Sequence, residues 1–201
     1  MLMKIAILGG SFDPPHLGHI LIASQVKELL GMDQVWLMPA YQHPFHKQLS
    51  DTTHRLTMTK LLETDAIKVS DFEIQHNKES YTIDTLHALS KLHPEDTFYW
   101  IMGSDQLQSF QKYKDWKGVI DNYHLIIFPR EWILPFFKEK VMDALALQTI
   151  PENVIVLQND DLVLTNVSST LIRKRIKDGL SIDYLVPERV KEHIKKNKLY
   201  Q

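Results

Sequence analysis

The chain contains 201 residues, with 23 lysines and arginines against 25 aspartates and glutamates, so its formal net charge is −2 with histidine neutral. This balance excludes a protein that binds nucleic acid or a membrane surface through overall positive charge, and 44% hydrophobic residues exclude a disordered or collagen-like chain. The absence of cysteine excludes disulfides and thiolate metal sites.

The first predicted element lies in the N-terminal sequence MLMKIAILGG. Its apolar run is short, ends in two glycines and has no cleavage-site pattern. No stretch of the chain reaches the ~20 apolar residues of a membrane span. We therefore expect a strand here, and a cytoplasmic protein with no membrane partner.

Short β-rich segments alternate with segments of helical period, which predicts a parallel sheet covered by crossover helices. The predicted strands are Ile5–Leu8, Val35–Met38, Ile67–Val69, Phe98–Ile101, Leu125–Phe128 and Val154–Leu157. The predicted helices run from about Leu17 to a stop at Gly31, then over Thr53–Glu63, Ile83–Leu92, Pro135–Leu145 and Thr170–Lys177, with a last helix opened by Pro187. The expected fold is one doubly wound, Rossmann-like α/β domain over 1–201, with C-terminal helices in 168–201 packed on it.

The segment after the first strand, GGSFDPPHLGH at 9–19, is the first candidate site. Its two glycines permit close backbone approach, and its two prolines stiffen the loop before the helix. His16 and His19 are three residues apart at the helix start, so both imidazoles lie on one face beside the N–H groups of the first turn. This combination favours phosphate. The GxGxxG and GK[ST] motifs are absent, which argues against a dinucleotide fingerprint or a P-loop.

Two other interpretations of the histidine pair are open at this point. One alternative is a metal site, but zinc needs a third ligand, and no HExxH-like helix supplies one. Alternatively, the segment is an ordinary turn with satisfied histidines. Asp13 precedes two prolines, so we expect it to cap a turn rather than to bind metal or act as a base.

A second candidate anion site lies at VSSTLIRKRI, 167–176. Ser168 or Ser169 suits a helix N-cap, and Arg173, one turn later, can reach back over the helix N-terminus. Taken alone, the segment is more typical of a capped helix with a solvated basic face than of an anion site.

The two motifs together resemble the nucleotidyltransferase superfamily, marked by HxGH and by a later (S/T)xxxR signature that Ser169 and Arg173 match. Within it, the chain is similar to the bacterial nicotinate-nucleotide adenylyltransferases over nearly its whole length. Supporting segments are HK at 46–47, SYTIDTL at 80–86, GSD at 103–105, the aromatic stretch at 110–116 and DYLVP at 183–187.

The resemblance implies an enzyme that transfers the adenylyl group of ATP to nicotinate mononucleotide, giving deamido-NAD and pyrophosphate. It places the catalytic residues His16, His19, Lys47 and Arg173 at the phosphates, with His19 nearest the α-phosphate. It places the remaining binding residues in three groups: Gly9, Gly10, Ser11 and Phe12 in the backbone cradle; Gly103 and Asp105 near the adenosine ribose, with Ser168 and Ser169 on the triphosphate; and Tyr81 and Thr82 in the pyridine nucleotide pocket.

The chain departs from the family pattern in three places. The usual PPHK reads PFHK at 44–47, and the usual RPG reads REW at 130–132, where the family's arginine for the mononucleotide phosphate corresponds to Arg130. The family tryptophan that stacks on the pyridine ring aligns with Tyr113, while Trp116 follows three residues later. The sequence therefore leaves the stacking residue open between Tyr113 and Trp116.

The expected chemistry needs no protein nucleophile, because the attacking 5′-phosphate is already ionised. Positioned cations and N–H donors are expected to supply the acceleration. We expect no protein metal cage, only Mg²⁺ bound through the ATP phosphates. Alternatives are the same chemistry on nicotinamide mononucleotide or phosphopantetheine, a non-catalytic nucleotide-binding protein, and a histidine-dependent metallohydrolase. No nucleic-acid partner is expected, and a homo-oligomer is left open.

Overall fold

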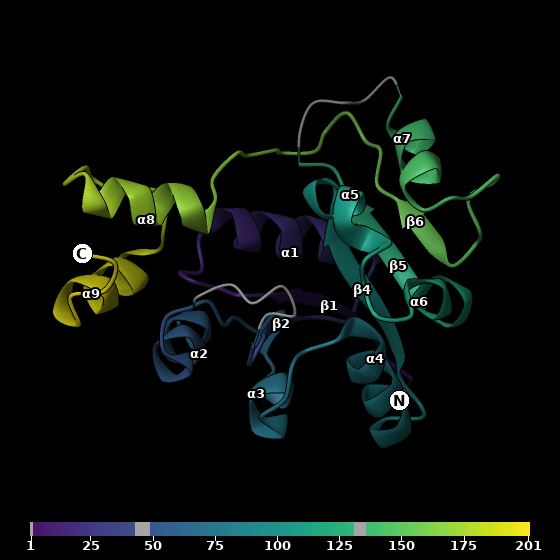
Figure 1. The fold of residues 1–201 in the computed structure, drawn as a ribbon, viewed down its shortest axis with the longest axis horizontal. Coiled ribbons are helices and arrows are strands. Elements are labelled where there is room, and N and C mark those ends of the chain that lie inside the picture. The colour runs from purple at the N-terminus through teal and green to yellow at the C-terminus, as the bar shows by residue number, and fades with distance from the viewer. Residues whose placement is uncertain (1, 43–48, 131–135) are drawn as a thin grey trace.

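The computed structural model describes residues 2–42, 49–130 and 136–201. Its sheet has six parallel strands in the order β3-β2-β1-β4-β5-β6 (Figure 1). They are β1 (Lys4–Gly10), β2 (Gln34–Pro39), β3 (Ile67–Val69), β4 (Thr97–Gly103), β5 (His124–Phe128) and β6 (Val154–Val156). Strand order reverses between β1 and β4, and ligands of such sheets bind at the carboxyl ends of the strands beside this switch point.

Helices cover both faces of the sheet, and each set packs on its own hydrophobic cluster. One cluster takes buried residues from α1 (Leu17–Leu30), α2 (Thr52–Lys60), α8 (Ser169–Lys177) and α9 (Glu188–Lys196). The other takes them from α4 (Thr82–Leu92), α5 (Leu107–Phe110), α6 (Trp116–Asn122) and α7 (Phe137–Ala144). Two short elements, α3 (Phe72–His76) and the 3₁₀ helix η1 (Ser104–Gln106), complete the described chain.

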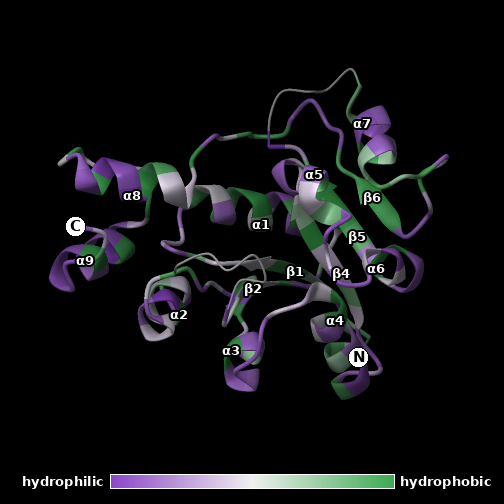
Figure 2. Cartoon of the chain, viewed as in Figure 1, coloured by the Kyte–Doolittle hydropathy of each residue, from purple (hydrophilic) through white to green (hydrophobic). Residues whose placement is uncertain are grey.

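Side chains of β1 alternate between the two clusters, as a strand buried on both faces requires. Ala6 and Leu8 belong to the first cluster, and Ile5 and Ile7 to the second. In Figure 2 the central strands are mostly green, whereas the helices around them carry purple stretches toward the outside. Burial on both faces fixes the sheet and therefore the position of its carboxyl edge.

The predicted doubly wound sheet is confirmed, with shifts at element ends. Gly31 ends α1 with φ 60°, as predicted. The helix predicted over Thr53–Glu63 ends at Lys60, because the next three N–H groups form tighter i→i−3 bonds. The helix predicted from Pro135 begins at Phe137, and Pro135 itself lies outside the described residues. The short elements α3, η1, α5 and α6 were not predicted, because such short segments show almost no periodicity.

The segment between β6 and α8 crosses back along α1 (Figure 1). Gln25 of α1 holds it on both sides: its Nε2 donates to the Val163 carbonyl at 3.1 Å, and its Oε1 accepts from the Val163 N–H at 2.7 Å. Because the segment runs toward the start of α1, α8 begins next to the loop that follows β1. Two parts of the chain some 150 residues apart thus meet at the carboxyl edge, as the Ser169 Oγ to Pro14 carbonyl bond of 2.8 Å shows.

Arg55 of α2, to which the sequence analysis gave no role, is buried, with 1% of its surface exposed. Its guanidinium donates to the carbonyls of Ser11 and Ala40, at 2.9 and 2.7 Å. It also donates to the carbonyls of Tyr41 and Ser50, at 3.0 and 3.1 Å. Burial lowers the pKa of Arg55, and nearby Asp13 opposes that shift. One side chain therefore ties together the loops that follow β1 and β2.

Within the described ranges, no helix is both long and apolar enough to cross a membrane.

We predict that Arg55→Lys lowers the free energy of unfolding by about 3–5 kcal/mol, because one ammonium group cannot reach four buried carbonyls spread around a planar fork. Lys191→Ala, which breaks two ion pairs on the exposed side of α9, should cost under about 1 kcal/mol. Urea unfolding of both variants checks the contrast. Equal losses would mean that Arg55 is not the support described here.

Candidate functional site

The loop between β1 and α1, residues 11–16, lies at the carboxyl edge beside the switch point, and distant side chains hold its backbone. Arg55 donates to the Ser11 carbonyl. Arg173 Nη1 donates to the Asp13 carbonyl at 2.6 Å, and Ser169 Oγ to the Pro14 carbonyl. The loop has no regular structure of its own, so these donors satisfy carbonyls that a helix or sheet would otherwise pair.

His16 and His19 stack with their ring centroids 3.8 Å apart at the start of α1. The backbone N–H of His16 donates to Nδ1 of His19 at 3.1 Å. An Nδ1 that accepts carries no proton, so neutral His19 carries its proton on Nε2. Phe12 packs on the His19 ring with centroids 4.6 Å apart. The contact network thus fixes His19 as an N–H donor through Nε2.

Burial keeps both rings neutral near pH 7. His16 is 2% exposed, and burial, with a smaller contribution from the Arg130 charge, lowers its pKa to about 3. For the partly exposed His19, desolvation lowers the pKa, and His16 and Arg130 add to that effect. His16 Nδ1 is buried without a hydrogen-bond partner in the described residues. An unsatisfied buried ring nitrogen at a ligand site is a polar group that a bound ligand can satisfy.

Gly18, which lies between His16 and His19 in the sequence, is needed for this packing. A Cβ added there would come within 3.0 Å of the His16 ring and within 3.3 Å of Thr165. The glycine of the HxGH motif therefore lets the His16 ring and the β6–α8 segment close against α1. This gives a physical reason for a residue that the sequence analysis treated only as part of the motif.

Arg173 projects from α8 toward the same loop. Besides its bond to the Asp13 carbonyl, Nη2 donates to Thr170 Oγ1 at 3.4 Å. Ser168 is the N-cap of α8 and accepts from the Leu171 N–H at 3.2 Å. The hydroxyls of Ser168 and Ser169 are thus engaged within the protein, and both residues position the start of α8 beside the histidines.

Arg130 lies at the carboxyl end of β5, next to the histidines. Its Nη2 donates to the Val167 carbonyl at 3.2 Å, and its N–H donates to Ser104 Oγ at 2.9 Å. Its charge contributes to the lowered pKa of both imidazoles. A Cβ on Gly103 would crowd the Asp105 carboxylate and the Arg130 side chain, so a larger residue here would displace them. The segments that follow β4 and β5 and the segment before α8 therefore meet beside the loop that follows β1.

A cavity of about 300 Å³ opens beside Gly9 and Gly10. The start of α4 forms part of its wall, and its N-cap, Tyr81, makes no side-chain cap bond. The first N–H groups of a helix lack intrahelical partners, so this end can receive an anion. The lining residues are Gly9, Gly10, Ala40, Glu73, Ser80, Tyr81, Thr82, Trp100, Asp105, Gln106, Ser109, Lys112, Tyr113 and Lys114.

The structure separates the two aromatic candidates. Tyr113 lines the cavity, with its hydroxyl donating to Gln106 at 3.0 Å, and burial raises its pKa to about 12. Trp116 is not among the described lining residues and packs edge-on against Phe110 with centroids 6.3 Å apart. The chain changes direction between the two aromatics because Asp115, the N-cap of α6, is in the left-handed conformation with φ 45°.

The sequence analysis did not single out several residues that line the cavity, among them Glu73 and Trp100. Glu73 on α3 is 6% exposed, accepts from Thr85 Oγ1 at 2.7 Å, and has a pKa raised by burial. Trp100 on β4 packs where a Cβ on Gly9 would otherwise lie. Glu73 had a usable signal, since an acidic residue between apolar Phe72 and Ile74 suggests a buried partner. Trp100 lies in a predicted strand, where the sequence does not distinguish it from an ordinary core residue.

The expectation that Asp13 caps its own turn is wrong. Asp13 is 2% exposed, its Oδ2 accepts from the Ser50 N–H at 3.0 Å, and its Oδ1 accepts from the Tyr200 hydroxyl at 2.6 Å. The cause is tertiary: the chain places distant donors where a turn would have offered local ones.

Lys47 lies outside the described residues. In the described part of the chain, no three histidine or acidic side chains gather where they could hold a metal ion. A larger hollow of about 610 Å³ lies around the starts of β4 and β5, at Thr97 and His124. That is the opposite edge of the sheet, and it contains none of the candidate residues, so we place the site at the smaller cavity.

Comparison with known proteins gives consistent matches over the whole chain. The cytidylyltransferase-like family model matches residues 7–175. The nicotinate-nucleotide adenylyltransferase of Bacillus subtilis is 34% identical, over 98% of each chain. A probable nicotinate-nucleotide adenylyltransferase of Exiguobacterium sibiricum is 39% identical, over 98% of this chain and 99% of the relative.

Among solved structures, the nicotinic acid mononucleotide adenylyltransferase of Plasmodium falciparum, complexed with NaAD, superposes with a TM-score of 0.82. The match covers 98% of this chain and 97% of the other at 22% sequence identity. At this identity the likeness establishes the shared fold.

We predict that stability falls as the pH drops from 7 to 5, because the unfolded chain protonates His16 near 6.5 while the folded protein does so only at about 3. The stabilising contribution of the neutral ring is complete above about pH 6.5 and is lost toward the lower value. His16→Asn should flatten the slope of unfolding free energy against pH by up to about 1.4 kcal/mol per pH unit. Urea unfolding across this range, with the exposed His87→Asn as control, measures it; an unchanged slope would contradict the burial argument.

Proposed function

The chain belongs to the nicotinate-nucleotide adenylyltransferase family, and we infer that it transfers the adenylyl group of ATP to nicotinate mononucleotide, giving deamido-NAD and pyrophosphate. The observation that carries the mechanism is the meeting of three cationic or donor groups from distant segments. His19 on α1, Arg130 after β5 and Arg173 on α8 all lie beside the loop that follows β1.

The reaction joins two polyanions, so the main barrier is their mutual repulsion and alignment. The 5′-phosphate of the mononucleotide attacks the α-phosphorus of ATP, the bond to the β-phosphate oxygen breaks, and pyrophosphate leaves. The nucleophile is already ionised and needs no protein base. Groups fixed in advance around the phosphates can supply the acceleration through position and charge.

The imidazoles are arranged to donate to the reacting phosphate. With Nδ1 held by the His16 N–H, His19 offers Nε2–H, which we assign to the α-phosphate oxygens. A neutral ring can enter this buried site without the penalty of desolvating a charge. His16, stacked beneath it, keeps the ring in place and adds a second donor.

The two arginines supply the positive charge. Arg173 is assigned to the departing pyrophosphate, with Lys47 of the undescribed segment expected on the same phosphates. Arg130 lies close enough to both rings to lower their pKa values, and we assign it to the junction between the triphosphate and the incoming phosphate. Guanidinium groups suit this task because their planar donor sets match phosphate oxygens.

The residues present fit a Mg²⁺ ion that enters with ATP rather than one held by the protein. Both oxygens of Asp13 accept hydrogen bonds from protein groups, from Ser50 and Tyr200. The described residues form no cluster of three metal-binding side chains. Bound through phosphate oxygens, the ion would neutralise charge on the triphosphate.

The cavity beside Gly9 and Gly10 is assigned to the pyridine nucleotide. Of the two aromatic candidates, Tyr113 is the one that lines it, and Tyr113 is proposed to stack on the pyridine ring. Thr82 begins α4, and the uncapped N–H groups of that helix favour a carboxylate over a neutral carboxamide. This favours nicotinate over nicotinamide. Gly103 and Asp105, at the end of β4, are assigned to the adenosine ribose.

The direct test follows pyrophosphate release from ATP with the acid or the amide mononucleotide at equal concentrations. We expect pyrophosphate release when ATP and a mononucleotide are both present, and a higher kcat/KM for the acid mononucleotide than for the amide. Absence of release with either mononucleotide would refute the reaction, and a preference for the amide would refute the assignment of the α4 N-terminus.

We predict that His19→Ala lowers kcat by roughly 10²–10³, because an oriented donor at the reacting phosphate is lost. The cost in folding should be small, since the ring is partly exposed. Steady-state rates and a urea unfolding curve measure the two effects, with the exposed His87→Ala as control. Near-normal turnover in a folded variant would remove His19 from the mechanism.

We predict that Tyr113→Ala raises KM for nicotinate mononucleotide at least about tenfold, as loss of an aromatic stacking partner removes roughly 1–3 kcal/mol. KM for ATP should change much less. Trp116→Ala is the matched variant and should leave both constants nearly unchanged. The opposite pattern would show that Trp116 is the stacking residue.

A further inference from the structure

The segment after α9 returns to the loop that follows β1. Tyr200 lies 187 positions from Asp13, and its hydroxyl donates to Asp13 Oδ1 at 2.6 Å. We propose that Tyr200 is a positioning residue of the nucleotide site, acting through Asp13 on the loop that carries His16. This inference rests on the proposed function, because it assigns the loop to the phosphates of ATP.

Asp13 is the point at which three separate segments are joined. Its Oδ2 accepts from the Ser50 N–H, ahead of α2, and its carbonyl accepts from Arg173 of α8 at 2.6 Å. The Tyr200 hydroxyl supplies the remaining carboxylate contact. A carboxylate that is 2% exposed needs such partners, since an unpaired buried charge is costly. Loss of one of these contacts lets Asp13 reorient, and the Asp13 carbonyl that Arg173 binds then moves with it.

The segment that bears Tyr200 is held in place by its own packing. Leu199 and Tyr200 pack against the hydrophobic cluster that also contains α1, α8 and α9. The Leu199 N–H donates to the Ile194 carbonyl at 3.1 Å. Lys198 and Tyr200 adopt positive φ values of 50° and 65°, which side-chain-bearing residues rarely do. Such a backbone persists where the surroundings determine it, so the hydroxyl is aimed by the fold.

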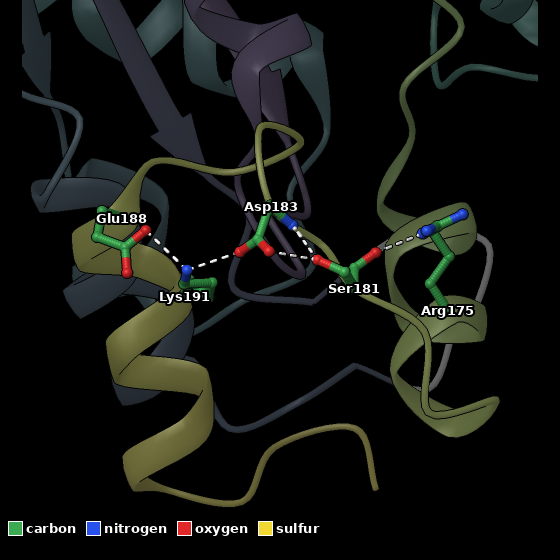
Figure 3. A network of polar contacts seen from close by, with 5 residues as sticks. All are labelled: Arg175, Ser181, Asp183, Glu188 and Lys191. Carbon is green, nitrogen blue, oxygen red and sulfur yellow. Dashed lines mark hydrogen bonds and ion pairs between the residues drawn. The ribbon is translucent and has the colours of Figure 1, made fainter.

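Helices α8 and α9, which deliver Arg173 and Tyr200, are also joined to each other (Figure 3). Arg175 Nε donates to the Ser181 carbonyl at 2.7 Å, and Ser181 Oγ donates to Asp183 Oδ2 at 2.6 Å. Lys191 of α9 donates to Asp183 Oδ1 at 2.7 Å and pairs with Glu188 at 2.8 Å. The guanidinium and the hydroxyl that meet at Asp13 thus come from one connected unit.

The chemistry of Tyr200 fits a fixed donor. Burial, together with the contact to Asp13, raises its pKa, so the hydroxyl keeps its proton near neutral pH. Arg55 lies near both Asp13 and Tyr200, and Arg173 lies near Tyr200. Among the described residues, the hydroxyl bonds Asp13 and also interacts with Ser50, and neither residue lines the cavity, so its influence on substrate passes through the loop.

The test is Tyr200→Phe, which removes one oxygen and keeps the packing. ATP binding is measured by calorimetry without an acceptor, and KM and kcat are measured for each substrate. We expect the Kd for ATP to rise roughly tenfold, kcat to fall, and KM for the mononucleotide to stay within about twofold. Tyr184→Phe, at a tyrosine that is 91% exposed on the same unit, should match the parent protein.

Unchanged ATP binding in Tyr200→Phe would overturn the proposal. Equal weakening of both substrates in step with lost stability would also overturn it, since that indicates a merely structural role. In an Asp13→Ala background, Tyr200→Phe should add no further loss, whereas additive losses would contradict action through Asp13. If Asp13→Ala does not fold, the ATP binding of Tyr200→Phe alone decides the proposal. If the parent protein binds ATP but transfers no adenylyl group, the proposed function is refuted. The comparison of ATP binding between the parent protein and Tyr200→Phe still tests this inference.

Discussion

The structure depends on holding an irregular loop, residues 11–16, in which the carbonyls of Ser11, Asp13 and Pro14 are paired with distant side chains. Five donors from other segments satisfy these carbonyls or the Asp13 carboxylate: Arg55, Ser169, Arg173, Tyr200 and the Ser50 N–H. Buried backbone groups must be paired, so the loop can exist in this form only when α2, α8 and the segment after α9 are docked. Folding of the distant segments and assembly of the site are therefore the same event.

This arrangement explains how a weakly acidic protein can receive two polyanions. Two arginines, Arg130 and Arg173, lie at the carboxyl edge of the sheet, where their charges add to the field of the helix N-termini. The imidazoles are neutral by burial, and His19 is oriented by a backbone N–H rather than by a carboxylate. Donors that are already fixed need no reorganisation when charge develops on the phosphate.

Much of this could be predicted from the sequence, and the exceptions have physical causes. Gly9 and Gly10 after a buried strand, the spacing of His16 and His19, and Arg173 one turn into a capped helix are local patterns, and local patterns fix local structure. The parallel sheet followed from strict alternation of strands and helices. Arg55 escaped because a charged residue in a sequence gives no sign that distant carbonyls surround it. The apolar neighbours of Glu73 indicate burial, but they do not show that the Thr85 hydroxyl is its partner. The choice between Tyr113 and Trp116 depended on one left-handed residue, Asp115, which no periodicity reveals.

The central claim is that His19, Arg130 and Arg173 surround one triphosphate bound over the loop at 11–16. A crystal structure of the protein with a non-hydrolysable ATP analogue tests it most directly. The account predicts the α-phosphate at hydrogen-bond distance from His19 Nε2 and the β- and γ-phosphates against Arg173. A triphosphate bound away from the histidines, or an Arg173 turned from it, would contradict the account.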